Sequence, residues 1–100
     1  MWILQSATDA EGDSWTFRIA PGAIKTIGRA PRADFVVEAA LVSRLHCRLT
    51  ASDSAIDVTD LDSTNGTYIN NQRIRSGSLA SGDRLKVGRV EMTIARQDLT

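Results

Sequence analysis

The chain has 100 residues, of which 42% are hydrophobic and 24% are charged, a balance typical of one globular domain rather than of a disordered or membrane protein. Its 12 basic and 12 acidic residues cancel, whereas a protein that binds duplex nucleic acid usually has a clustered basic excess. The single cysteine, Cys47, excludes an intrachain disulfide and a thiolate metal cluster. These numbers predict one small domain and argue against nucleic acid as its ligand.

The first residues do not have the pattern of a targeting signal. Residues 1–6 lack the basic start and the long apolar core of a signal peptide, and no later apolar run reaches membrane-spanning length. A lone cysteine fits a reducing compartment. We therefore expect a cytoplasmic protein, or a nuclear one in a eukaryote, with no membrane partner.

Strand-like alternation first appears at residues 15–19, where Trp15, Phe17 and Ile19 alternate with polar residues. Turn-forming residues lie on both sides of this run, at 9–14 and at Pro21-Gly22. The pattern predicts a half-buried strand between two turns.

Residues 39–49 carry a helical pattern instead. Ala40, Leu41, Leu45 and Leu49 recur at near-helical spacing, so local periodicity alone predicts an amphipathic helix there. Only the family resemblance described below overrides that prediction.

Alternation returns at Ile56 and Val58 and then in two runs, 84–87 and 90–94, which Gly88-Arg89 separates. The last two runs predict a hairpin. Further turn signals lie at 52–54, 70–71 and 81–83. Short strands that recur at such intervals predict an antiparallel β-sandwich or barrel.

Three polar motifs lie between these elements: Gly28-Arg29, Ser-Arg-Leu-His at 43–46, and Leu-Asp-Ser-Thr-Asn-Gly-Thr-Tyr-Ile-Asn at 61–70. A phosphothreonine brings nearly two negative charges and three acceptor oxygens, so its receptor needs a guanidinium and neutral donors rather than a catalytic base. Arginine, hydroxyl and carboxamide side chains supply such donors. The motifs predict phosphate binding without chemistry on the phosphate.

A catalytic interpretation has less support. Ser43, His46 and Asp60 are the residue types of a nucleophilic triad, but no Gly-x-Ser-x-Gly elbow or other nucleophile context accompanies Ser43. His46 is the only histidine, and no acid or thiolate cluster surrounds it at metal-ligand spacing. We expect no catalytic residue, no metal and no cofactor.

The ordered set of motifs, extended by Gly82-Asp83 and Gly88, resembles the forkhead-associated (FHA) domain from about residue 24 to residue 94. Each motif alone is a weak pattern, whereas the ordered set is specific. The resemblance implies an all-β fold, an FHA/SMAD-like antiparallel sandwich of two twisted sheets with about eleven strands and the binding loops at one end. Residues 1–100 would then form a single domain.

The resemblance also implies roles for individual residues. The phosphate would be bound by Arg29, Ser43, Arg44 and Thr64, with Arg44 at a position that contacts the phosphate in some members only. The peptide main chain would be bound by Asn65 and Asn70. Support of the binding loops would come from Gly28, His46, Ser63, Gly66 and Thr67.

Two further positions could adjust the specificity of the site. Asp62 stands where the family often has glycine, and it adds a negative charge near the loop. Leu41 lies two residues before Ser43, where the family selects the third side chain after the phosphothreonine, and its apolar side chain suggests an apolar partner residue.

We therefore expect a non-catalytic, monomeric phosphothreonine-recognition module that recruits a Thr-phosphorylated protein in Ser/Thr kinase signalling. Two other classes stay open: an FHA-like structural or oligomerising domain that acts without phosphate, and a nucleic-acid binder that uses arginines 29, 32, 44 and 48. The intact phosphate-binding set argues against the first, and the neutral charge and few aromatic residues argue against the second.

Overall fold

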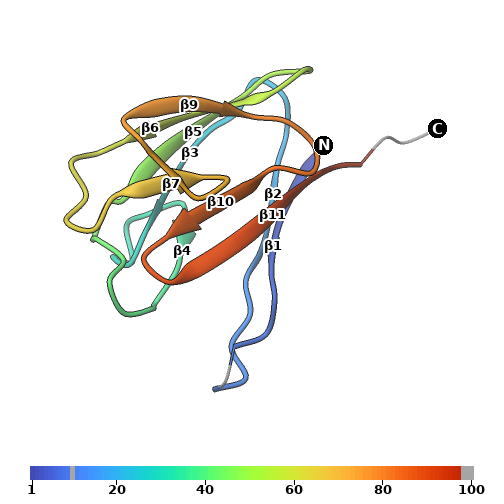
Figure 1. Cartoon of the computed structure of the whole chain (residues 1–100). Coiled ribbons are helices and arrows are strands. Elements are labelled where there is room, and N and C mark those ends of the chain that lie inside the picture. Colours follow the sequence, from blue (N-terminus) through green and yellow to red (C-terminus); the bar gives the residue numbers. More distant parts are fainter. Residues whose placement is uncertain (10, 98–100) are drawn as a thin grey trace.

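The structure is a computed structural model that describes residues 1–9 and 11–97, and eleven β-strands form its regular framework (Figure 1). Their bounds are β1 Trp2–Ser6, β2 Thr16–Ile19, β3 Ile24–Gly28, β4 Phe35–Val36, β5 Cys47–Ala51, β6 Ile56–Asp60, β7 Thr67–Ile69, β8 Gln72–Ile74, β9 Ser76–Leu79, β10 Arg84–Val87 and β11 Val90–Arg96. The predicted all-β class is confirmed. Residues 98–100 of the predicted domain lie outside the described residues.

The strands form two sheets that pack face to face. One has six strands in the order β2-β1-β11-β10-β7-β8, and the other has five in the order β4-β3-β5-β6-β9. Paired strands run antiparallel, except that β4 runs parallel to β3. The parallel pair arises because the chain leaves the end of β3, forms the loop 29–34 and returns beside the same strand.

The core lies between the sheets and follows the two-residue period of the strands. In β5, Cys47, Leu49 and Ala51 are buried, and β11 buries Val90, Met92 and Ile94 in the same way. Two side-chain contacts also connect the two sheets. The indole Nε1–H of Trp2 donates to the Ser52 carbonyl at 2.8 Å, and the rings of Phe17 and Phe35 stack with centroids 4.6 Å apart.

The helical pattern at 39–49 does not correspond to a helix. Leu41 lies in a turn with φ 71° and is 45% exposed, whereas Leu49 is a buried residue of β5. The helical spacing therefore joined residues of two different elements, a loop and a strand. The prediction from periodicity alone was wrong at this segment.

Turn chemistry was predicted more reliably. Asn70 and Asn71 both have left-handed backbones, with φ 49° and 69°, and they connect β7 to β8 as a two-residue hairpin turn. Gly88, with φ 59°, begins the turn of the predicted hairpin between β10 and β11. These turns fix the register of the strands that flank them.

Three loops gather at one end of the sandwich, toward the left of Figure 1. They are the β3–β4 loop (29–34), the β4–β5 loop (37–46) and the β6–β7 loop (61–66). All three carry the polar motifs found in the sequence. Within the described part of the chain, no helix is long and apolar enough to span a membrane.

Candidate functional site

His46 joins the β4–β5 loop to the β6–β7 loop. Its ring is fully buried; Nδ1 accepts the Ser43 backbone N–H at 3.0 Å, and Nε2 lies 2.8 Å from the Gly66 carbonyl oxygen. Because Nδ1 is an acceptor, Nε2 must carry the proton and donate it to Gly66. This neutral tautomer satisfies both ring nitrogens and holds the two loops at a fixed separation.

The β6–β7 loop is held in shape by Asp60 at the end of β6. One carboxylate oxygen accepts the Ser63 hydroxyl at 2.5 Å and the Thr67 hydroxyl at 2.7 Å, and the other accepts the Ser63 N–H at 3.2 Å. Burial acts to raise the pKa of Asp60, but the hydrogen bonds from Ser63 and Thr67 outweigh it and keep the pKa below its usual range. The charged carboxylate is thus part of the loop's internal support.

Gly66 completes that support in two ways. Its N–H donates to Ser63 Oγ at 3.0 Å, and its φ of 89° is in the left-handed region that favours glycine. A Cβ at this position would also lie 2.7 Å from Nε of Arg73. Arg73 therefore covers the loop next to Gly66.

Gly28 allows β3 to approach the β4–β5 loop closely. A Cβ on Gly28 would lie 2.0 Å from the Arg44 carbonyl oxygen, and the following N–H groups of Arg29 and Ala30 donate to the carbonyls of Ser43 and Arg44 at 2.9 and 3.1 Å. The sequence assigned Gly28 to support of the binding loops. The structure gives the reason for glycine, since φ of Gly28 is not left-handed and the close backbone contact requires the missing Cβ.

Two further hydrogen bonds connect the loops at their exposed surface. Ser43 Oγ accepts the Thr64 N–H at 3.1 Å, and Asn65 Nδ2 donates to the Leu41 carbonyl at 3.1 Å. The Ser43 hydroxyl hydrogen stays available to an acceptor, because its oxygen acts as acceptor in the Thr64 contact. Asn65 likewise keeps Oδ1 and one N–H for other partners.

Beside this cluster lies a groove of about 620 Å³, which we call the arginine groove. Its lining residues are Arg29, Ala30, Pro31, Arg32, Arg44 and Leu45. Arg29 and Arg44 are exposed, and neither side chain makes a hydrogen bond or ion pair within residues 1–9 and 11–97. The site thus combines hydroxyl and amide donors with unpaired guanidinium groups.

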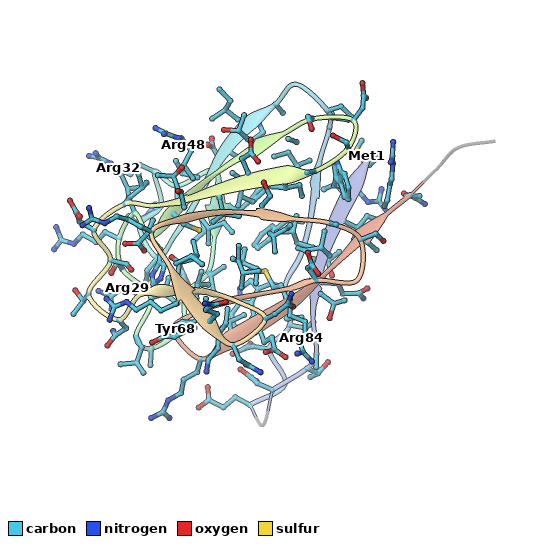
Figure 2. All side chains as sticks on the ribbon, turned by 45° about the horizontal axis from the view of Figure 1, so that its top comes forward. Met1, Arg29, Arg32, Arg48, Tyr68 and Arg84 are labelled. Atoms are coloured by element: carbon cyan, nitrogen blue, oxygen red, sulfur yellow. The ribbon has the colours of Figure 1, made fainter. Side chains whose placement is uncertain are left out.

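Asn70 lies apart from this cluster. Its Nδ2 donates to Asp83 at 3.2 Å, and its Oδ1 accepts the Arg84 N–H at 3.0 Å. In Figure 2, Arg84 lies to the right of Arg29, toward the lower middle of the view. The carboxamide of Asn70 connects the β7–β8 turn to the start of β10. Hydrogen bonds from the Ala80 N–H and, to a lesser extent, from Asn70 lower the pKa of Asp83.

The structure also adds a residue that the motifs did not reveal. Arg73 pairs with Tyr68 across the β7–β8 hairpin, which directs its side chain back over Gly66. The two-residue turn at Asn70-Asn71 fixes this register. Counting outward from that turn would have paired Arg73 with Tyr68 from sequence alone.

The hydrolase alternative lacks a base. Both ring nitrogens of His46 bond to backbone groups, so neither faces Ser43 Oγ, and the Asp60 carboxylate bonds to Ser63 and Thr67. Cys47 is no nucleophile either, because burial, with the nearby charge of Asp60, raises the pKa of its thiol to about 12. Among the described residues, no group of three or more His, Cys, Asp or Glu could hold a metal ion.

A second groove, of about 650 Å³, has the opposite charge, and we call it the acidic groove. It lies between the β1–β2 loop, the start of the β4–β5 loop and β11. Five carboxylates line it together with Trp15 and one guanidinium: Asp9, Glu11, Asp13, Glu38, Glu91 and Arg89. Positive and negative side chains are therefore segregated between two grooves.

Comparison with known proteins places the similarity over the same loops. The family model described as the FHA domain matches residues 25–88. The oxoglutarate dehydrogenase inhibitor of Corynebacterium diphtheriae is 36% identical over 67 residues, which cover 67% of this chain and 47% of that protein. The glycogen accumulation regulator GarA of Mycobacterium tuberculosis is 34% identical over 70 residues, covering 70% of this chain and 43% of that protein. The chain spans about half the length of the curated relatives it matches.

Solved structures extend the similarity to nearly the whole fold. The FHA domain of the CT664 protein from Chlamydia trachomatis superimposes with a TM-score of 0.87 at 20% identity, covering 97% of this chain and 98% of that one, which is a likeness of fold alone. A structure from an analysis of phosphothreonine-dependent FHA domain interactions has a TM-score of 0.79 at 29% identity and covers 99% of this chain and 100% of that one.

Proposed function

Because the chain belongs to the forkhead-associated domain family, we propose that it binds a phosphothreonine peptide and so recruits a Thr-phosphorylated partner in Ser/Thr kinase signalling. The FHA domain is a non-catalytic interaction module, as the similarity to regulators rather than enzymes indicates. The observation that carries the proposal is the pair of loops locked together by His46 beside unpaired Arg29 and Arg44.

The proposed phosphate site uses Arg29, Ser43, Arg44 and Thr64. A phosphate bound beside the loops would receive charge-assisted hydrogen bonds from the guanidinium groups and neutral ones from the Ser43 and Thr64 hydroxyls. The contacts of Ser43 with Thr64 and His46 hold these donors in place before ligand arrives. Preorganisation of this kind reduces the entropy lost on binding.

The proposed peptide main-chain contact is Asn65. Its carboxamide keeps one acceptor and one donor beyond the bond to Leu41, and this pair suits the C=O and N–H of an extended peptide. We assign Asn70 to support instead, because its carboxamide already bonds to Asp83 and Arg84. Gly28, His46, Ser63, Gly66 and Thr67 complete the proposed supporting set.

The experiment compares three peptides of one sequence that carry phosphothreonine, phosphoserine or unmodified threonine, titrated calorimetrically. We expect binding of the phosphothreonine peptide and none of the unmodified peptide. Arg29→Ala should weaken binding of the phosphothreonine peptide by about ten- to 150-fold, the effect of losing a charge-assisted hydrogen bond of about 1.5–3 kcal/mol. Arg18→Ala, which removes an exposed arginine of β2 that does not line the arginine groove, is the matched control.

Equal affinity for phosphorylated and unmodified peptides would contradict the proposal and favour phosphate-independent association. Binding to an oligonucleotide with strong salt dependence, together with indifference to phosphothreonine, would favour the nucleic-acid alternative. The first result would be apparent in the same peptide titrations, and the second in a parallel titration with an oligonucleotide at low and high salt.

A further inference from the structure

The arginine groove extends beyond the cluster proposed for the phosphate. Ser43 and Thr64 do not line it, and from Arg29 and Arg44 it continues along the β3–β4 loop to Arg32. Its lining includes three guanidinium groups and no carboxylate. A phosphate bound by Arg29 and Arg44 brings about two negative charges, so it would leave the third arginine of the groove, Arg32, without a negative partner on the ligand.

Arg32 is held on a short, rigid turn. The Ala33 N–H donates to the Ala30 carbonyl at 3.0 Å, which closes a β-turn with Pro31 at its second position, where proline is preferred. Ala33 is 5% exposed and anchors the turn in the core. The turn therefore presents Arg32 at the groove in a defined place.

Hydrogen bonds on both sides fix this turn to the scaffold. Before it, the Ala30 N–H donates to the Arg44 carbonyl at 3.1 Å. After it, the Asp34 carboxylate accepts the Thr26 N–H at 2.9 Å, and the Asp34 N–H donates to Thr26 Oγ1 at 3.1 Å. Asp34 is thus directed toward β3, and its hydrogen bonds to Thr26 lower its pKa.

The Arg32 guanidinium makes no hydrogen bond or ion pair with any residue in the described ranges. Figure 2 shows Arg29 and Arg32 on the same side of the molecule, away from Arg84. An exposed, unpaired arginine on a rigid turn beside a phosphate site is suited to a second anionic group on the same ligand.

We infer that Arg32, at the end of the arginine groove, forms a second anion subsite that receives a carboxylate or a second phosphorylated side chain of the bound peptide. This inference rests on the proposed function, because the phosphothreonine would position the peptide in the groove. The preferred partner is then a phosphothreonine segment with another negative side chain close by in the sequence.

The test is an acid scan of a phosphothreonine peptide. Aspartate replaces alanine at one position at a time on both sides of the phosphothreonine, and each peptide is titrated against the wild-type chain, Arg32→Gln and Arg48→Gln. Arg48 is an exposed arginine that does not line the groove, so its variant reports any general effect of removing one positive charge. A second series places phosphothreonine or phosphoserine at the best position.

We expect one position where aspartate lowers Kd by about two- to five-fold, the range of a single exposed ion pair, and a second phosphate should lower it further. Arg32→Gln should abolish this gain in affinity and leave the affinity for the phosphothreonine peptide without added aspartate nearly unchanged. Arg48→Gln should retain the gain.

Two outcomes would overturn the inference while leaving the proposed function standing. In one, every phosphothreonine peptide binds with the same affinity wherever aspartate is placed. In the other, Arg32→Gln and Arg48→Gln equally reduce the increase in affinity that aspartate gives, which indicates a general effect of positive charge rather than a subsite at Arg32. Absence of binding by every phosphothreonine peptide would instead overturn the proposed function, and the inference with it.

Discussion

Replacement of His46 by alanine tests the central feature of the site. The substitution removes both hydrogen bonds that connect the loops and leaves the Ser43 N–H and the Gly66 carbonyl without partners. A buried polar group without a partner costs about 1–3 kcal/mol. Two such groups give a loss of about 2–5 kcal/mol in the free energy of unfolding, once some access of water to the vacated space is allowed for.

This loss is large beside the 5–15 kcal/mol that stabilises a typical domain. It is measured by urea unfolding, followed by tryptophan fluorescence, to which the buried Trp2 and the partly buried Trp15 both contribute. Peptide titrations at low temperature, where the variant stays folded, report binding separately. We expect weaker binding that still depends on the phosphate, because in our proposal His46 positions the loops without touching the ligand.

His46→Asn provides the matched control. The asparagine Oδ1 can replace Nδ1 as acceptor of the Ser43 N–H but does not reach Gly66, so the variant should lie between wild type and His46→Ala in stability. Unchanged stability of His46→Ala together with abolished binding would refute the reasoning and show that the histidine contacts the peptide.

Three further predictions concern the scaffold. Gly28→Ala should cost about 1–3 kcal/mol or more in unfolding free energy and weaken peptide binding, because its Cβ would meet backbone atoms. Gly77→Ala should cost less, because the atom that its Cβ would meet is the flexible end of the Ile69 side chain. Equal losses in the two variants would contradict this account. Cys47 should react with thiol reagents only as the chain unfolds, so its labelling rate should follow the urea dependence of unfolding; rapid labelling without urea would show the site to be open. The pKa of Asp60 is lower in the folded than in the unfolded state. Its charged carboxylate therefore contributes fully to the free energy of unfolding above the unfolded-state pKa of about 4, and this contribution is lost as the pH falls through the folded-state pKa. In urea titrations at a series of pH values, Asp60→Asn should reduce the decrease in the free energy of unfolding at acid pH. An unchanged decrease would exclude Asp60 as a cause of the acid sensitivity.

The strands could be predicted where a single face is buried. Ile56 and Val58 of β6 and the runs of β10 and β11 alternate cleanly, and the structure buries them as the alternation indicates. The segment 39–49 could not be predicted from local pattern, because Leu41 and Leu49 belong to a loop and a strand that happen to share a spacing. Tertiary packing, which a local window does not contain, decides such a segment.

The site could be predicted as a set of residues but not as a set of contacts. Motif order identified Ser43, His46 and Thr64, and the structure brings Ser43 into contact with both others. Glycine is required at position 28 because the backbone of Arg44 lies close to it, and this contact between residues far apart in sequence is not visible in a local pattern. The rigid turn that presents Arg32 depends likewise on bonds to Arg44 and from Asp34 to β3, which only the folded chain brings together.

The segregation of charge between the two grooves gives this electrically neutral chain one locally positive and one locally negative surface. Its net charge is zero, yet the arginine groove contains three guanidinium groups, whereas the acidic groove has five carboxylates and one guanidinium. Under our proposal, an acidic phosphopeptide that approaches by diffusion would be attracted by the arginine groove and repelled by the acidic groove, so productive encounters would begin at the binding loops. The rate of association would then decrease as salt screens the field, even though the chain as a whole carries no net charge.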